Sequence, residues 1–356
     1  MNVARGTHRS NSKIRNRADQ NPSWSRLLEY PSLATSGLIQ RLTLGLVPHR
    51  VKTSYSLPPW SINLVTNLSC DYQCSYCSNT MIADAALQSA LPSEWHKPMN
   101  PKVWLAVLKK FRLFRPVINI FGGEPLHYPY IFEMIKAFRR DGFFVSMTTN
   151  GRHLEAHAKD LVSSGLNVLG VSFDGPPSPF SSITGNPQAH QYSFNGITAF
   201  KEAQKANSDF NRSLVPCDIK VILTINSHNY DKIVSTIDEM ASLKPDLIAI
   251  RHLIFNTPSA MRRMDSSCCN IEGGVEFNFG GQEGNGRFST IDGRTVHSGI
   301  QKAKTVARAA GIPLVVEPEY GEDQCIQYYS NDVKEILPNR PCRTPWNILN
   351  IYPNGD

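Results

Sequence analysis

The chain has 356 residues, of which 41% are hydrophobic, and it carries a formal net charge of +7. This is enough for a sizeable core and about two domains. No run approaches the roughly 18 apolar residues of a membrane span, and Met1–Gln20 is polar and basic rather than a secretory signal. We therefore expect a soluble, cytoplasmic protein with no membrane partner.

The first segment, residues 1–58, shows no strong periodicity apart from a short amphipathic helix expected near Ser36–Leu46. Its first 20 residues hold five Arg or Lys residues against Asp19 alone. Such a start suits a transit peptide or a nucleic-acid arm, but a solvated, disordered tail is the simpler interpretation. Nucleic acid is therefore not an expected partner, and Pro58–Pro59 marks the boundary.

From Ser61 onward, short β-rich runs alternate with segments of helical period. Apolar residues recur at helical spacing within 103–111, 131–138 and 233–240. Such alternation predicts βαβ units and a parallel sheet. The six expected strands are Ile62–Thr66, Val117–Phe121, Phe144–Thr148, Val168–Phe173, Ile219–Ile225 and Leu247–Ile254.

A glycine-rich connection over residues 256–298 follows the sixth strand, and a connection of this length is usually functional or disordered. A helix near Ile300–Ala310 and a strand at Ile312–Val316 are expected next. The sequence thus divides into 1–58, a core over 59–311, and a C-terminal part over 312–356.

The most informative pattern is Cys70, Cys74 and Cys77, directly after the first strand. The other five of the eight cysteines are scattered, which favours reduced thiols and a metal site over a disulfide framework. Three thiolates can hold a [4Fe–4S] cluster and leave one iron open for a small molecule. A zinc site completed by His96 or a distant cysteine, and a chance grouping of inert thiols, are the alternatives.

Three further motifs follow successive strands: Phe121-Gly-Gly-Glu-Pro125, Thr149-Asn-Gly151 and Ser172-Phe-Asp-Gly-Pro176. Together with C-x3-C-x2-C, in this order over about residues 60–255, they resemble the radical S-adenosylmethionine (SAM) superfamily. The resemblance implies an α/β fold, a partial (βα)6 TIM-like barrel, with chemistry at the carboxyl ends of its strands. It also implies reductive cleavage of SAM to a 5′-deoxyadenosyl radical that abstracts hydrogen from a substrate.

The resemblance assigns Cys70, Cys74 and Cys77 to a [4Fe–4S] cluster, reduced by a donor such as flavodoxin or ferredoxin. It places Tyr76 against the adenine of SAM, although simple core packing is the alternative.

Five further SAM contacts are implied. Gly122 and Gly123 lack a Cβ and admit the methionine moiety, and Glu124 accepts from its ammonium. The alternative for this motif is a plain turn. Ser172 contacts the methionine or ribose portion, unless it only caps nearby backbone, and Ile222 lies against the adenine, unless it only packs in the core.

One departure concerns the stretch Ser181–Gly185, where close relatives usually carry an arginine for the SAM carboxylate. Here another cation must serve, or the SAM pose differs. This absence slightly favours a different class, a non-catalytic iron–sulfur scaffold derived from the same fold; a zinc-binding adaptor is a third hypothesis.

The C-terminal part resembles the opening of a twitch or SPASM domain, because Cys342-x12-Gly355 fits half of its entry pattern. Pro353-Asn-Gly reads as a hairpin turn without its return strand. We therefore expect an incomplete twitch/SPASM-like extension, about four irons in total, and loose docking of the residues after Pro345. The alternative is that Cys342 is a lone thiol.

Radical SAM enzymes with a twitch or SPASM domain act on peptide or protein side chains, or on sugar-like small molecules. The sequence does not distinguish between these two substrate classes. The thiols of Cys217, Cys268 and Cys269 are candidate hydrogen donors to a product radical, although inert buried thiols are commoner.

Overall fold

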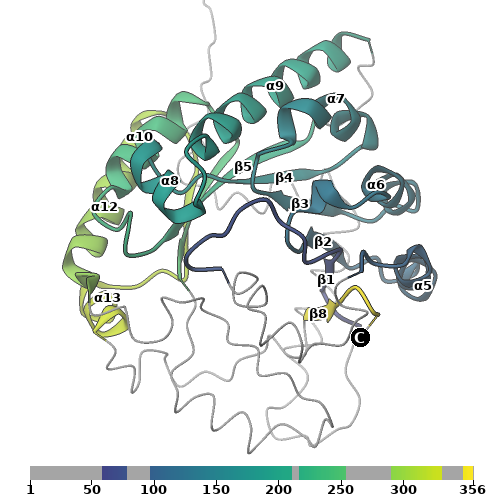
Figure 1. The fold of residues 1–356 in the computed structure, drawn as a ribbon, viewed down its shortest axis with the longest axis horizontal. Helices are drawn as coiled ribbons and strands as arrows, with labels where there is room; N and C mark the ends of the chain where they lie inside the picture. Colours follow the sequence, from purple (N-terminus) through teal and green to yellow (C-terminus); the bar gives the residue numbers. More distant parts are fainter. Residues whose placement is uncertain (1–57, 78–96, 211–215, 254–289, 331–347, 356) are drawn as a thin grey trace, which may run out of the picture.

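The computed structural model describes residues 58–77, 97–210, 216–253, 290–330 and 348–355. These form one open, all-parallel sheet of eight strands in the order β7-β6-β5-β4-β3-β2-β1-β8. The sheet curves, and the helices cover its outer face (Figure 1). The strands are β1 Ser61–Val65, β2 Val117–Phe121, β3 Val145–Thr149, β4 Val168–Ser172, β5 Asp218–Ile225, β6 Leu247–His252, β7 Leu314–Glu317 and β8 Ile348–Ile351.

The helices follow the strands in chain order, as the βαβ pattern predicts. None in the described part of the chain combines the length and the apolar character that a bilayer crossing needs. They are α5 Pro101–Phe111, the short 3-10 helix η3 Pro125–His127, α6 Ile131–Arg140, α7 Leu154–Ser164, α8 Pro177–Thr184, α9 Ala189–Phe210, α10 Ile233–Ser242, α12 Gly293–Ala309 and α13 Glu322–Tyr329.

The six predicted strands are confirmed as β1–β6, with ends that move by no more than two residues. The core forms where the helices meet the sheet. In α6 the four apolar residues of the predicted stripe, Ile131, Met134, Ile135 and Phe138, are all at most 1% exposed. The predicted partial barrel of the TIM type is therefore confirmed, with two more strands on its edges.

The predicted boundary of the insertion at 298 is wrong, because α12 begins at Gly293. The side chain of Asp292 accepts hydrogen bonds from the backbone N–H groups of Arg294 and Thr295 and so caps the helix. An N-cap aspartate was the sequence signal for this start, and the glycine that follows it obscured the helical period. Most of the predicted insertion lies outside the described residues, as do the predicted tail and helix in residues 1–57.

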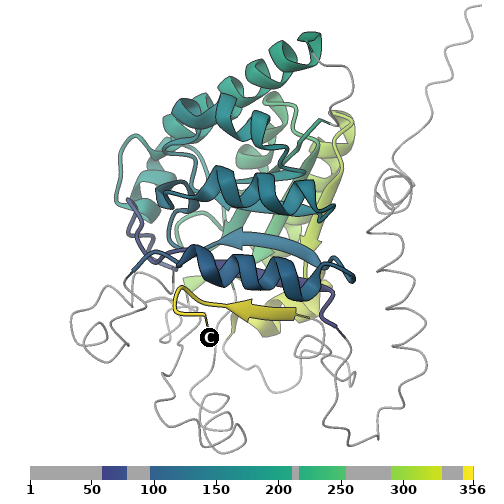
Figure 2. The same ribbon diagram turned by 90° about the vertical axis from the view of Figure 1, so that its right-hand side faces the viewer.

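The expectation of loose docking after Pro345 is wrong for the described residues 348–355. Strand β8 pairs in parallel with β1, and Nδ2 of Asn63 donates to Oδ1 of Asn350 at 2.8 Å. Figure 2 shows this yellow strand along the edge of the sheet. The predicted turn is present, with Gly355 N–H donating to the carbonyl of Tyr352 and φ of Gly355 at 98°. Thus β7 and β8 extend the core sheet.

Candidate functional site

The loop that carries the three cysteines leaves the carboxyl end of β1 and lies against the end of α8. The backbone N–H of Gln73 donates to the carbonyl of Thr184 at 3.1 Å, and that of Ser75 donates to Ile183 at 2.9 Å. Helix α8 ends here because Gly185 adopts a left-handed φ of 70°. The stretch that lacks the expected arginine therefore supports the cysteine loop with its backbone.

The two glycines after β2 pack against the same loop. Gly123 N–H donates to the carbonyl of Asn67 at 2.8 Å. A Cβ on Gly123 would lie 2.1 Å from the backbone oxygen of Ser69, and one on Gly122 would lie 2.4 Å from that of Asn67. Glycine is needed at both positions because the two backbones are in contact. The predicted approach of SAM's methionine to these glycines stays a prediction.

Cys70, Cys74 and Cys77 share one loop, and the other two cysteines lie near enough to Cys74 to affect its pKa. Burial, and after it the proximity of Cys77, raises the pKa of Cys74 well above its usual value. Burial likewise raises the pKa of Cys70, to which Nδ2 of Asn150 donates at 3.6 Å. The thiols of Cys70 and Cys74 therefore resist ionisation until a cation compensates the thiolate, as metal-ligating cysteines do. The donor set therefore fits an iron–sulfur cluster with one iron not bound by cysteine.

Glu124 is fully buried and joins the loops after β2 and β3. Its Oε1 accepts from the backbone N–H of Leu126 at 3.0 Å and from Oγ1 of Thr149 at 2.7 Å. Its Oε2 accepts from the backbone N–H of Asn150 at 2.8 Å. Burial raises the pKa of this carboxyl group, and these three bonds oppose the rise. A carboxylate has about four acceptor directions, and these three bonds leave about one. Because Glu124 is 0% exposed, the predicted bond to the SAM ammonium stays a prediction.

Tyr76 connects the cysteine loop to the ends of β4 and β5. Its hydroxyl donates to Oδ2 of Asp174 at 2.6 Å, while Oδ1 accepts from the backbone N–H of Thr224 at 2.9 Å. Burial raises the pKa of Asp174 to about 6, against the effect of these bonds. Asp174 had no predicted role, although its position just after a strand could have indicated a place in the site. The predicted contact of Tyr76 with adenine stays a prediction.

Ser172 and Ile222 are neighbours in the register of β4 and β5. Ile222 is 4% exposed, and the carbonyl of Ser172 accepts from the hydroxyl of Ser193 at 3.2 Å. Ser172 is the last residue of β4, two positions before Asp174, whereas Ile222 lies beside Ser172 within β5. The structure thus brings the six predicted SAM-binding residues to this edge of the sheet. They are Tyr76, Gly122, Gly123, Glu124, Ser172 and Ile222, and their contacts with SAM stay predictions.

The cysteines away from the triad divide into two groups. Cys217 is buried and immediately precedes β5, at the end of the sheet opposite the triad, so it is misplaced as a hydrogen donor. Cys325 is fully buried in α13, and burial raises its pKa to about 11. Cys268, Cys269, Cys342 and the predicted zinc ligand His96 lie outside the described residues.

A second group of side chains at this edge was missed by the sequence analysis. Asp71 adjoins Cys70, His127 ends η3, and His153 is the N-cap residue of α7. Both His Nε2 atoms lie 2.8 Å from Oδ2 of Asp71 and 3.2 Å from each other. The available signal was that each residue sits within three residues of one of the strand-end motifs.

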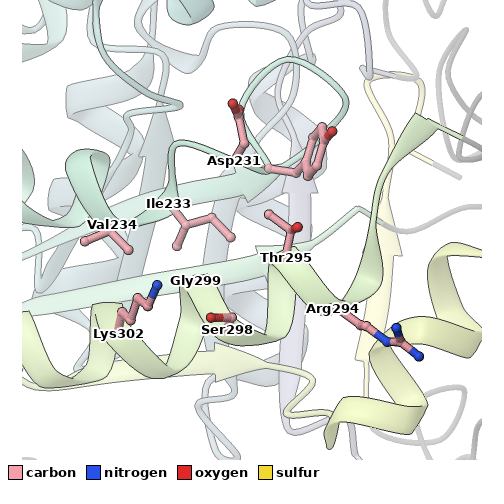
Figure 3. A pocket seen from close by; sticks show the side chains of 9 residues that line it. Asp231, Ile233, Val234, Arg294, Thr295, Ser298, Gly299 and Lys302 are labelled. Atoms are coloured by element: carbon pink, nitrogen blue, oxygen red, sulfur yellow. The ribbon is translucent and has the colours of Figure 1, made fainter.

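A pocket of about 400 Å³ lies elsewhere, between α10 and α12 on the outer layer (Figure 3). Ile233 and Val234 of α10 line it together with Thr295, Ser298 and Lys302 of α12. Tyr230 and Asp231, from the turn between β5 and α10, complete its lining. None of the lining residues belongs to the cysteine loop, so the pocket is separate from it.

The comparisons with known proteins agree with this geometry. Residues 64–216 match the model of the radical SAM superfamily. A SAM-dependent nucleotide dehydratase of Fibrobacter sp. (strain UWH6) is 30% identical over 192 residues, which cover 52% of this chain and 53% of that protein. A GTP 3',8-cyclase of Picosynechococcus sp. is 35% identical over 141 residues, 36% of this chain and 40% of the cyclase. The chain thus spans about half the length of such relatives, or less.

Among solved structures, Streptococcus suis SuiB bound to SAM superposes with a TM-score of 0.54 at 14% identity, covering 92% of this chain and 71% of SuiB. This likeness concerns the fold. The family match identifies residues 64–216 as a radical SAM domain. That family implies a [4Fe–4S] cluster and SAM as cofactors.

Proposed function

We propose that this protein is a radical SAM enzyme whose cluster is held by Cys70, Cys74 and Cys77. The observation that carries the proposal is the placement of three cysteines in one loop at the carboxyl edge of the sheet, where they affect one another electrostatically, within a radical SAM domain. When bound, the [4Fe–4S] cluster supplies the electron that cleaves SAM, and the resulting 5′-deoxyadenosyl radical abstracts hydrogen from the substrate.

The chain's own residues position the reactants in this proposal. Glu124 accepts from the SAM ammonium through its remaining acceptor direction, while its other bonds fix it in place. Tyr76 and Ile222 lie against the adenine, and Ser172 contacts the methionine or ribose portion. The partly buried hydrogen bond from Tyr76 to Asp174 holds that ring in place before SAM binds.

The substrate class has two candidates, a peptide or protein side chain and a sugar-like small molecule. The names of two curated relatives concern nucleotides, which contain a sugar, so nucleoside triphosphates are the first substrates to test. SuiB has also been solved with a precursor peptide, which makes peptides the second. A flavodoxin or ferredoxin serves as the electron donor, in the cytoplasm.

The test is SAM cleavage by anaerobically reconstituted and reduced protein, measured as 5′-deoxyadenosine and methionine. Wild type is expected to form both, and Cys74→Ala is expected to lose the cluster absorbance and the cleavage. Cys217→Ala is the matched control, because Cys217 is also buried but lies at the other end of the sheet. Full cleavage by Cys74→Ala would remove this ligand from the proposal; an intact cluster without any cleavage in wild type would instead support the iron–sulfur scaffold.

A further inference from the structure

We propose that Asp71, His127 and His153 form a second metal site, which binds one divalent ion of the zinc class. Their ligand atoms, one carboxylate oxygen and two imidazole nitrogens, all lie within 4.8 Å of one another. The three residues come from the loops that follow β1, β2 and β3, so strand ends far apart in the sequence deliver them to one point.

Hydrogen bonding alone does not satisfy this arrangement. Oδ2 of Asp71 is only an acceptor, so both nearby Nε2 atoms must carry a proton to bond to it at 2.8 Å. Two protonated Nε2 atoms then face each other at 3.2 Å, donor against donor. A metal ion removes the conflict, because it takes a lone pair from all three atoms at once.

The spacing also fits a metal. Ligands at about 2.0–2.1 Å from a tetrahedral zinc ion are ~3.3 Å apart. The two Nε2 atoms already have nearly this separation, at 3.2 Å. The carboxylate oxygen must withdraw by about half an ångström to reach such spacing. Its side chain is 21% exposed, and those of His127 and His153 are 25% and 36% exposed, so none is locked in the core.

The surrounding groups orient the ligands. The Nδ1 of His127 lies 3.2 Å from the hydroxyl of Ser69, a contact of the kind that fixes the ring of a metal-bound histidine. The Arg152 guanidinium lies 3.8 Å from Oδ1 of Asp71, the oxygen that does not face the histidines. It also lies over the ring of Tyr192, 5.5 Å from its centroid, which holds its charge to that side.

The donor set selects the kind of ion. Two imidazoles with one carboxylate suit zinc and its transition-metal neighbours, whereas magnesium and calcium prefer oxygen ligands alone. Three protein ligands leave a fourth position open to water or an anionic group. Bound there, the ion joins the cysteine loop to the loops after β2 and β3, next to the cluster ligand Cys70.

The test uses the cluster-loaded protein, in which the triad cysteines are occupied. It is incubated anaerobically with equimolar zinc chloride and desalted, and iron and zinc are then measured together. Wild type is expected to keep about one zinc ion per chain with its iron unchanged, and zinc is expected to raise the thermal unfolding midpoint by mass action. His127→Ala and His153→Ala are expected to keep almost no zinc and all of their iron.

His157→Ala is the matched control, because its side chain has the same 36% exposure as that of His153 and lies in the same helix region. It is expected to keep the zinc. Zinc retained by both histidine variants, or absent from wild type, overturns the proposal.

A second measurement does not depend on how the variants fold. X-ray absorption at the zinc edge of wild type is expected to show nitrogen and oxygen ligands at about 2.0–2.1 Å. Sulfur ligands at about 2.3 Å would place the zinc on cysteines and overturn the assignment.

Discussion

The carboxyl edge of the sheet holds buried polar groups in two different ways. On the β1–β4 side, the carboxylates of Glu124 and Asp174 are at most 1% exposed. Glu124 accepts three hydrogen bonds and Asp174 accepts two through its side chain, from residues on neighbouring loops and strands. Burial of these acids is offset by donors, which is how a rigid polar site is maintained.

At the end of β6, by contrast, His252 is buried among aromatic rings and has few hydrogen-bond partners. Its Nδ1 lies 2.7 Å from the hydroxyl of Tyr329, but its Nε2 has no hydrogen-bond partner among the described residues. The rings of Tyr320, Tyr328 and Tyr329 surround it at 5.0–5.8 Å. Burial lowers the pKa of His252 to about 4, so this side avoids charge. One edge thus has two buried, hydrogen-bonded carboxyl groups and an aromatic cluster around a histidine that stays neutral.

Among the variants on the polar side, Gly123→Ala is expected to cause the largest loss of stability. The new Cβ would meet the backbone of Ser69 at 2.1 Å, which forces the cysteine loop away from β2. We expect a loss of at least about 3 kcal/mol in the free energy of unfolding, together with loss of iron. Denaturant unfolding and iron analysis measure both.

Gly185→Ala is the control for this prediction, because Gly185 has a φ of 70° and a Cβ added there would have nothing within 4 Å. Only the conformational cost applies there, about 1 kcal/mol. Equal losses in the two variants would show that the contact between the two loops is not what requires Gly123.

The next effect is expected from Glu124→Ala. This change leaves three donors, including the backbone N–H groups of Leu126 and Asn150, without their acceptor in a buried place. We expect about 3 kcal/mol of lost stability, and SAM affinity lower by about ten- to a hundredfold. Stability is measured by denaturant unfolding, and affinity by the spectral shift of the reduced cluster on adding SAM.

The exposed Glu155→Ala is the control, for which we expect a change within about 0.5 kcal/mol. A large loss of stability with unchanged SAM affinity would leave Glu124 a structural role only. No loss of stability would contradict the hydrogen-bonded arrangement itself.

A smaller and pH-dependent effect is expected on the aromatic side. Because the folded pKa of His252, about 4, lies below the usual 6.5, the unfolded chain takes up the proton first as the pH falls. His252 therefore lowers stability progressively between about pH 6.5 and pH 4, by about 2 kcal/mol at pH 5 relative to pH 8. Stability of wild type and His252→Asn is measured across this range.

Relative to His252→Asn, the free energy of unfolding of wild type should fall by about 2 kcal/mol from pH 8 to pH 5, because only wild type carries the histidine. A difference that stays constant from pH 8 to pH 5 would mean that His252 is not held neutral.

Features that depend on neighbouring residues could be predicted from the sequence, whereas features that depend on distant residues could not. The strands β1–β6 were predictable because each carries its own apolar run between turn residues, and the stripe of α6 because its period is local. The pairing of β8 with β1 was not predictable. Residues 348–351 are 287 positions from their partners in β1, and a strand of four residues is too short to show a clear pattern.

The candidate site divides in the same way. The cysteine triad and the motif at Gly122–Pro125 were found because their residues are adjacent in sequence. Asp71, His127 and His153 were missed because no single stretch contains them; only the common edge of a parallel sheet brings them together. The aromatic cluster was missed for the same reason, since His252 and Tyr329 are 77 residues apart.

The central claim is that the triad holds a cluster with an iron open to SAM. Electron paramagnetic resonance of the reduced, reconstituted protein before and after adding SAM tests it most directly. We predict about four irons per chain and a [4Fe–4S] signal whose g values change when SAM is added. A signal that SAM leaves unchanged, or purified protein that binds zinc at the triad in place of iron, would contradict the account.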